Sequence, residues 1–188
     1  MNTKQIYDYI ERLGNLLRTG SRHDLAEYGL QPIHLEVLHY LSLCNRYSDT
    51  PMGVTDYLGQ TKGTVSQTLK VLEKKRLLSK HPDSNDKRIT HLKISSAGKK
   101  LIDEIIPSSL FIHACEQLTE RSQTQTIKAL KELLQAIQYA NSMKSFGVCH
   151  TCRYNQKNEN NGYFCELTQE SLSSDDIQLI CREHQNIT

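Results

Sequence analysis

Four cysteines are crowded into the last 40 residues of the chain, at a spacing that suits a metal ion. Their pattern is Cys149-x2-Cys152-x12-Cys165-x15-Cys181. A Cys-x2-Cys turn can place two thiolates on one ion, and two further ligands complete the tetrahedral site that zinc prefers. His184, three residues beyond Cys181, is the alternative fourth ligand. The segment has few apolar residues, so a metal ion would have to supply part of its folding free energy.

The same four thiols are compatible with two other kinds of chemistry. Four thiolates also suit an iron–sulfur cluster, and cysteines can act as redox-active thiols or disulfides. We favour structural zinc, and the regular spacing argues against a disordered tail. Cys44 and Cys115 are expected to pack as small hydrophobic residues on helices, with oxidation sensing as the alternative. No Gly-rich phosphate loop, paired carboxylates or His/Asp partner pattern accompanies the thiols, so we do not expect an enzyme.

The charge of the chain is concentrated in its middle. The 188 residues carry a net charge of only +2, yet residues 54–100 hold 11 Lys and Arg against 4 Asp and Glu, a local net charge of +7. A basic segment in a nearly neutral chain suggests a surface for a polyanion. The simpler interpretation is a solvated, lysine-rich face.

Length and composition exclude several classes of protein. The chain has room for one domain and a small module, and 37% hydrophobic residues suggest a core shared with a partner. No apolar run reaches 18 residues, so a membrane span is not expected. The first residues lack the apolar stretch of a secretion signal, which predicts a reducing cytoplasm and argues against structural disulfides.

Apolar periodicity predicts a mainly α-helical fold with one small β-hairpin. Gly20 and Ser21 are expected to end the first helix, and Pro107 to interrupt the helical pattern that resumes after Ser95. Turn-forming residues 82–86 separate the two strands of the hairpin. The expected helices cover residues 3–19, 32–44, 54–58 and 61–75 and a long segment from Thr119, and the strands cover 77–81 and 88–95, with a loop at 45–53.

Two short helices around Gly59, followed by a basic hairpin, form the plan of a winged helix–turn–helix. The second helix would enter the DNA major groove with a polar outer face, while Lys87 and Arg88 at the hairpin tip could reach a minor groove. The alternative is a surface helix beside a basic hairpin in an unrelated α+β protein. The outer residues that could read bases or bind phosphates are Lys62, Thr64, Ser66, Gln67 and Lys70, and the inner face has Val65, Leu69 and Leu72.

Three segments resemble the MarR family of transcriptional regulators. Residues 61–73 (TKGTVSQTLKVLE) resemble the family's recognition helix, 83–88 (DSNDKR) its wing signature with an Asp-x-Arg core, and 94–98 (ISSAG) the start of the next helix. The resemblance covers about residues 3–143. Two positions depart from the pattern, because Thr55 stands where the family often has Ala and Arg76 where it usually has Gly.

This resemblance implies a homodimer whose N- and C-terminal helices interlock. It implies that Arg88 approaches the minor groove and is held partly by Asp86. It also implies a cleft for a small-molecule effector, for which Tyr7, Tyr9 and Tyr28 are candidate lining residues. The cysteine-rich tail lies outside the resemblance.

The sequence therefore predicts a winged helix–turn–helix with N- and C-terminal dimerisation helices and a small metal-binding tail. We expect a homodimeric, sequence-specific regulator of transcription, a repressor, on pseudo-palindromic double-stranded DNA, with no membrane association. The alternative is a metal- or redox-responsive sensor in which the tail controls DNA binding. The predicted parts are an N-terminal helix and linker (1–30), the winged domain (31–96), the C-terminal dimerisation helices (97–144) and the cysteine-rich module (145–188).

Overall fold

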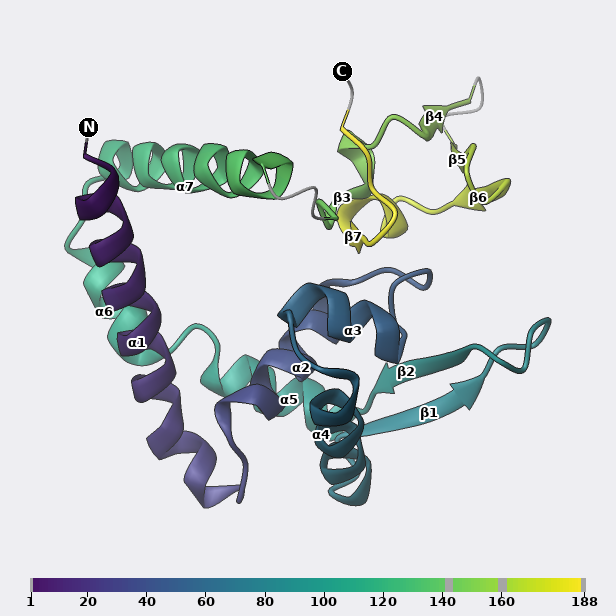
Figure 1. The fold of residues 1–188 in the computed structure, drawn as a ribbon, viewed down its shortest axis with the longest axis horizontal. Coiled ribbons are helices and arrows are strands. Elements are labelled where there is room, and N and C mark those ends of the chain that lie inside the picture. The colour runs from purple at the N-terminus through teal and green to yellow at the C-terminus, as the bar shows by residue number, and fades with distance from the viewer. Residues whose placement is uncertain (1, 141–143, 159–161, 187–188) are drawn as a thin grey trace.

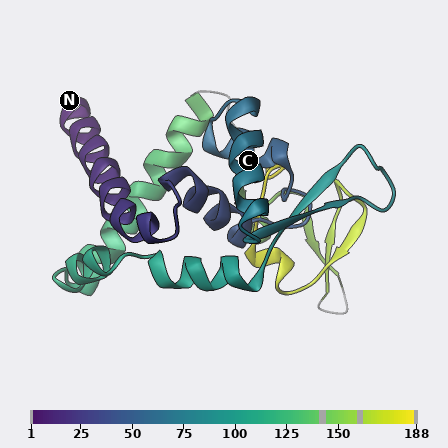
Figure 2. The same ribbon diagram turned by 90° about the horizontal axis from the view of Figure 1, so that it is seen from below.

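The computed structural model describes residues 2–140, 144–158 and 162–186. Residues 141–143, at the end of the predicted dimerisation segment, lie outside the described residues. A winged domain built from α2 to α5 and one hairpin lies beside a small β-module (Figure 1). Helices α1 and α6 lie to one side of the winged domain, and α7 runs from there back toward the module. The view turned by 90° places the wing and the module together on the side away from α1 (Figure 2).

The first helix is longer than the sequence predicted. Helix α1 spans Thr3–Glu27, so Gly20 and Ser21 do not end it. It ends instead at Gly29, whose φ of 59° is a left-handed conformation that glycine adopts without strain. Around this turn the backbone N–H of Leu30 donates to the carbonyl of Leu25. One glycine inside a long amphipathic helix costs only about 1 kcal/mol, which the rest of the helix offsets.

Helices α2 (Pro32–Leu43), α3 (Pro51–Leu58) and α4 (Lys62–Lys74) form the helical part of the winged domain. Helix α3 begins three residues before the predicted start, because Thr50 caps it by accepting a hydrogen bond from the N–H of Gly53 and because proline suits the first turn. Gly59 ends it at a φ of 61°, and Thr61 caps α4, both as predicted.

The wing is the antiparallel pair β1 (Leu78–Pro82) and β2 (Thr90–Ile94). The strands are close to the predicted ones but begin later. Arg76, which stands where the family usually has glycine, has a φ of 59° between α4 and the wing. A left-handed φ is uncommon for a residue other than glycine.

After the wing the chain forms α5 (Ser96–Ile105), α6 (Ser109–Glu116) and α7 (Glu120–Ala140). Pro107 separates α5 from α6, as predicted, and the hydroxyl of Thr119 accepts from the N–H of Ser122 at the start of α7. No described residue of α6 or α7 is buried. Among the described residues, no helix is both long and apolar enough to cross a membrane.

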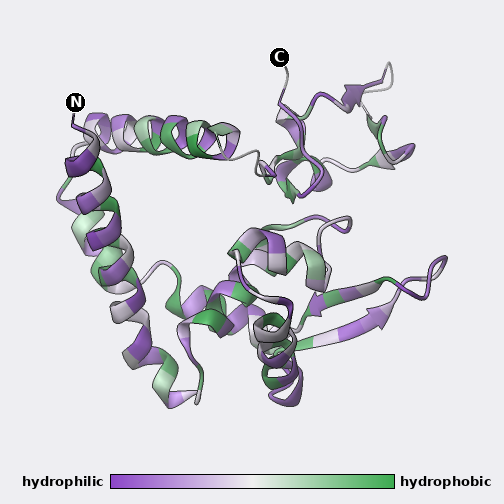
Figure 3. Ribbon diagram, viewed as in Figure 1, coloured by the Kyte–Doolittle hydropathy of each residue, from purple (hydrophilic) through white to green (hydrophobic). Residues whose placement is uncertain are grey.

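The hydrophobic core lies between α2, α3, α4, the wing and α5. Tyr40, Leu38, Leu72 and Val54 are fully buried there. In contrast, α1 and α7 carry rows of exposed apolar side chains. The ribbon of both helices alternates between hydrophobic and hydrophilic residues (Figure 3). These rows contain Ile6, Ile10, Leu13 and Leu17 on α1 and Ile127, Leu130, Leu134 and Ile137 on α7.

The C-terminal module folds around short strands. Its two sheets pair β3 (Gly147–Val148) with β7 (Ile180–Cys181), and β4 (Asn155–Lys157) with β5 (Tyr163–Cys165) and β6 (Glu170–Leu172). Among the described residues of the module, Cys149, Leu172 and Ile177 form a buried cluster of its own.

The module is attached to the winged domain by aromatic packing. Phe146, just before β3, is 9% exposed and makes edge-on contacts with the rings of Tyr40 and Tyr57 at centroid distances of 6.0 and 5.1 Å. Because Phe146 belongs to the main hydrophobic core, the module starts from inside the winged domain rather than from a free linker.

Candidate functional site

The outer face of α4 presents the polar side chains that the sequence singled out. Lys62, Thr64, Ser66, Gln67 and Lys70 are all exposed. On the inner face Val65, Leu69 and Leu72 are at most 2% exposed, and they fix the rotation of the helix about its axis. The hydroxyl of Thr64 lies 3.0 Å from that of the capping Thr61, so this residue also stabilises the start of the helix.

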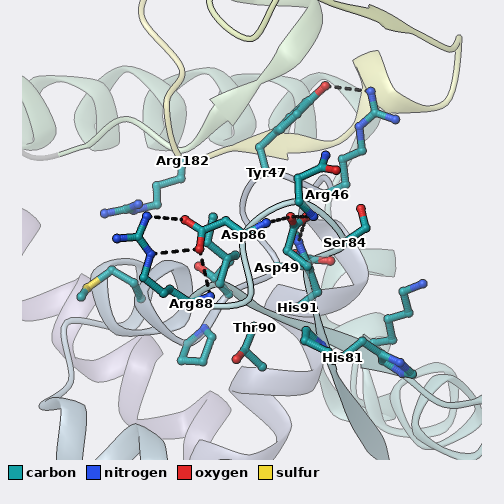
Figure 4. A pocket seen from close by; sticks show the side chains of 18 of the residues that line it. Arg46, Tyr47, Asp49, His81, Ser84, Asp86, Arg88, Thr90, His91 and Arg182 are labelled. Carbon is teal, nitrogen blue, oxygen red and sulfur yellow. Dashed lines mark hydrogen bonds and ion pairs between the residues drawn. The ribbon is translucent and has the colours of Figure 1, made fainter.

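At the wing tip a guanidinium is held in place while remaining in solvent. Arg88 donates from Nε and Nη2 to the two carboxylate oxygens of Asp86, each at 3.0 Å, and its backbone N–H donates to the same carboxylate (Figure 4). The side chain of Arg88 is 91% exposed. The hydrogen bonds from Arg88 lower the pKa of Asp86 below its ordinary value, so the pair stays ionised. Lys87 beside it is exposed as well.

His91 on β2 ties the wing to the rest of the domain, a role that the sequence did not reveal. Its Nδ1 lies 2.5 Å from a carboxylate oxygen of Asp49, and its Nε2 lies 3.1 Å from one of Asp83 (Figure 4). The hydrogen bond to Asp49 and, next, the one to Asp83 raise the pKa of His91 above its ordinary value. Burial raises the pKa of Asp49, against the pull of His91. Asp49 and His91 are 42 residues apart, so no local spacing pointed to this contact.

The wing, the loop between α2 and α3, and the module enclose an open cavity of about 1080 Å³ (Figure 4). Several charged side chains on its lining are paired with one another or with neighbours. Arg46 lies 2.6 Å from Glu170 and Arg182 lies 2.7 Å from Asp56. The cavity wall is thus held together by ion pairs between the module and the winged domain.

The four cysteines of the tail line one small cavity. Its volume is about 20 Å³, room for a single water-sized sphere. Cys149 and Cys152 are buried, and Cys165 and Cys181 are partly buried. Burial, with a smaller effect of the neighbouring thiols, raises the pKa of Cys149 to about 11. Among the described residues, no group of three or more His, Cys, Asp or Glu side chains has the arrangement to hold a metal ion. The thiols share a cavity without forming a finished ligand set.

His184, the alternative fourth ligand, is bonded elsewhere. Its Nδ1 lies 2.7 Å from the hydroxyl of Ser145, and its Nε2 lies 2.9 Å from that of Thr151. It is 6% exposed and is not part of the cavity that the four cysteines line. His150, between two of the cysteines, is exposed. The structure thus brings the four cysteines together and leaves both histidines outside.

A separate, mostly apolar pocket of about 360 Å³ lies between α1, α2 and the segment that joins α5 to α6. Leu35, His39 and Phe111 are among its lining residues, whereas Tyr7, Tyr9 and Tyr28 are not. Tyr7 and Tyr9 are exposed on α1, and the hydroxyl of Tyr28 donates to Glu104. These three tyrosines do not line this pocket, and their place in an effector cleft stays a prediction.

Comparisons with known proteins agree with this geometry. Residues 28–89, from the end of α1 to the wing tip, match a model of the MarR family. The chain is similar to a MarR transcriptional regulator from Methanosarcina mazei Go1, with 18% identity and a TM-score of 0.62 over 71% of this chain and 96% of that one. It is also similar to S. aureus MepR in its DNA-binding conformation, with 24% identity and a TM-score of 0.60 over 70% of this chain and 98% of that one.

A third similar structure is the complex of S. aureus MepR with DNA, at 24% identity and a TM-score of 0.56 over 69% of this chain and 97% of that one. No curated protein matches the chain. At these identities the similarity shows the fold, which is the winged helix–turn–helix of the MarR family. About three tenths of this chain has no counterpart in these structures.

The contacts of His91 predict a pH-dependent stability. Because its pKa is raised in the folded state, its contribution is complete below the unfolded value of about 6.5 and is lost as the pH rises through the folded value. We expect His91→Gln to lower the free energy of unfolding more at about pH 5.5 than at about pH 9, as measured by urea denaturation. His81→Gln is the control, since this ring bonds the hydroxyl of Ser79 instead. Equal losses at both pH values for His91→Gln would contradict the assignment.

Proposed function

We propose that this chain, whose winged domain has the MarR fold, is a sequence-specific, DNA-binding regulator of transcription that acts as a homodimer. We further propose that it represses, because a dimer that covers its operator excludes polymerase from the same DNA. The observation that carries the proposal is the pairing of two exposed features: the polar face of α4, and an arginine held at the tip of the wing by Asp86.

Each feature suits one groove of DNA. An α-helix fits the major groove, where Gln67 can make a bidentate contact to an adenine edge, while Lys62 and Lys70 suit guanine edges or phosphates. The minor groove has a negative potential that attracts a cation such as Arg88. The carboxylate of Asp86 reduces the number of orientations that the arginine must give up on binding. The protein in the MepR–DNA complex, which binds DNA, shares this fold.

The exposed apolar rows support a homodimer. Side chains such as Leu134 and Ile137 on α7 and Leu13 on α1 are about half exposed in the single chain. Monomeric proteins rarely expose contiguous apolar surface of this extent. A second copy related by two-fold symmetry would cover both helices and would place two copies of α4 on successive half-sites of a pseudo-palindrome.

The tail is proposed to bind one structural zinc ion through Cys149, Cys152, Cys165 and Cys181. The convergence of all four on one cavity supports this ligand set, and the bonds of His184 to two hydroxyls favour the fourth cysteine over it. An N–H donor already points at a sulfur, since the backbone of Gln185 lies 3.5 Å from Cys152. A zinc ion would lower the thiol pKa values that burial raises, and side-chain rotation would complete the site.

A second candidate function is a metal- or redox-responsive sensor, in which the tail controls DNA binding. It is favoured by the contacts that join the module to the winged domain, such as those of Arg46 with Glu170 and of Arg182 with Asp56. Through these contacts a change in the module could reach the domain that carries the wing. The apolar pocket beside α1 is our candidate place for a small-molecule effector.

DNA binding can be tested with two variants that fail in different ways. Arg88→Ala removes a charge-assisted contact and should weaken binding by about 2 kcal/mol on all operators. Gln67→Ala should instead change the preference at one base pair by about 1–3 kcal/mol. Affinities would be measured by fluorescence anisotropy at several salt concentrations, since phosphate contacts make binding salt-dependent. The matched control is Lys157→Ala, which removes a cation from β4 in the module. If Arg88→Ala and Gln67→Ala both bind DNA like wild type, the proposed placement of α4 in the major groove and of Arg88 in the minor groove is wrong.

Dimerisation through α7 can be tested with one buried charge. Leu134→Glu should shift the mass in multi-angle light scattering from two chains toward one, because an unpaired carboxylate in an apolar interface is strongly unfavourable. Gln125→Glu adds the same charge to another exposed position of α7 and should leave the mass at two chains. An unchanged dimer in Leu134→Glu would place the interface elsewhere.

The zinc site can be tested by elemental analysis of purified protein. Wild type should contain one zinc per chain, and Cys165→Ser should lose most of it, because a structural site needs all four ligands. Cys115→Ser, which changes another partly buried thiol, should keep the metal, and so should His184→Ala. Iron together with sulfide would indicate a cluster instead, and a metal-free wild type would favour the redox interpretation.

A further inference from the structure

One loop of the winged domain contacts both the cysteine-rich module and the wing. This is the stretch of residues 44–50 between α2 and α3, from here on called the α2–α3 loop. On one side it meets the strand that ends in Cys181, and on the other it holds His91 and Leu92 of β2. The cavity of the four thiols and the tip of the wing are therefore joined through this short segment.

The contacts on the module side are mostly hydrogen bonds. The backbone N–H of Arg182 donates to the hydroxyl of Ser48 at 2.8 Å, and the N–H of Asn45 donates to the carbonyl of Ile180 at 2.9 Å. Cys181 itself precedes Arg182 directly in the chain and follows Ile180. Arg182 adds an ion pair with Asp56 on α3, at 2.7 Å. A shift of Cys181 would thus be felt directly by the loop.

The middle of the loop is rigid. Asn45 is 2% exposed and Ser48 is fully buried. The hydroxyl of Ser48 donates to the amide oxygen of Asn45 at 2.8 Å, and the carbonyl of Ser48 accepts from the phenol of Tyr40 at 2.7 Å. Breaking any of these bonds would leave a buried polar atom without a partner, which is costly, so the loop should move as a unit or not at all.

The contacts on the wing side continue as far as the candidate DNA contact. The carbonyl of Asp49 accepts from the N–H of Leu92 at 2.7 Å, and its carboxylate bonds His91. His91 also bonds Asp83, whose carboxylate accepts from the N–H of Asp86 at 2.8 Å. Asp86 in turn orients Arg88. Each step from Cys181 to Arg88 is either a hydrogen bond or the covalent link between two adjacent residues.

We infer that the thiol cluster positions the wing through the α2–α3 loop, so that zinc at the four cysteines orders Arg88 for the minor groove. This inference rests on the proposed function for both the zinc site and the DNA contact. Strand β7 has only two residues, and Cys181 is one of them. Ligation of Cys181 would therefore hold Arg182 and its contacts in place, and loss of the ion would allow this short strand to separate from the loop.

The charges of the module argue against a direct contact between the module and DNA. Residues 145–188 contain three Lys or Arg against six Asp or Glu. An acidic surface would be repelled by phosphates. The cation of the module that reaches the winged domain, Arg182, is paired with the carboxylate of Asp56. The module therefore acts on DNA binding through the wing.

The first test is amide hydrogen exchange at the wing of the full-length dimer. Removing zinc with a chelator should speed exchange at Leu92 about tenfold, the effect of losing one charge-assisted contact. Arg182→Ala keeps the backbone hydrogen bond to Ser48 but removes the ion pair with Asp56 that holds β7 against the winged domain. It should therefore also speed exchange at Leu92 in the zinc-loaded protein, and Arg182→Lys should restore part of the protection. Arg153→Ala removes another cation of the module, one that lies over the ring of Tyr154, and should change nothing at Leu92.

The outcomes separate this inference from the proposed function. If zinc binds and DNA binds, but exchange at Leu92 is the same with and without zinc, the coupling is overturned and the proposed function stands. If no zinc binds, the proposed structural zinc site is rejected. The link between module and wing is then still tested by the exchange rate at Leu92 in Arg182→Ala. If the exchange rate at Leu92 is the same in Arg182→Ala as in the control Arg153→Ala, the link between module and wing is overturned.

A second test uses DNA affinity in a double-mutant cycle. In wild type, zinc removal should weaken operator binding about tenfold. In His91→Gln, whose link to Asp49 is cut, zinc removal should have little further effect, because both changes act on the same connection. Effects of zinc removal that are equal in wild type and His91→Gln would overturn the inference.

Discussion

The buried hydroxyl of Ser48 is the contact on which the arrangement of the parts depends. It accepts from the backbone of Arg182 in the module and donates to Asn45, while the carbonyl of the same residue holds Tyr40 in the core. A hydroxyl offers one donor and two acceptor positions, so one small side chain can serve two partners at once. Close approach of α3 is possible here only because Gly53 has no side chain, since a Cβ at Gly53 would collide with the Ser48 carbonyl.

Local patterns were sufficient to predict much of the winged domain. The inner face of α4 follows from the spacing of Val65, Leu69 and Leu72, and its start from the capping hydroxyl of Thr61. These features depend on residues three or four apart, which a sequence displays directly. The same reasoning failed at Gly20, because the weak helix propensity of one residue costs only about 1 kcal/mol inside a helix of 25 residues.

Contacts between distant segments could not be predicted. Nothing local marks His91 as the partner of Asp49, or Arg182 as the partner of Asp56, because each pair is joined only by the folded chain. The cysteine spacing predicted which residues are candidate ligands, and the structure brings the same four to one cavity. It gave no sign that the module contacts the α2–α3 loop. Arg76 was noticed as a departure from glycine, but its left-handed backbone appears only in the structure.

Because α6 and α7 are exposed in the single chain, the number of paired chains should depend steeply on how many chains the cell makes. Neither helix has a buried residue in the single chain, so a lone chain would retain little of the free energy that a covered interface provides. Lone chains would then be the preferred substrates of cellular proteases. The population of paired chains would rise more steeply than in proportion to the number of chains made, and a modest change in expression would give a sharper change in operator occupancy.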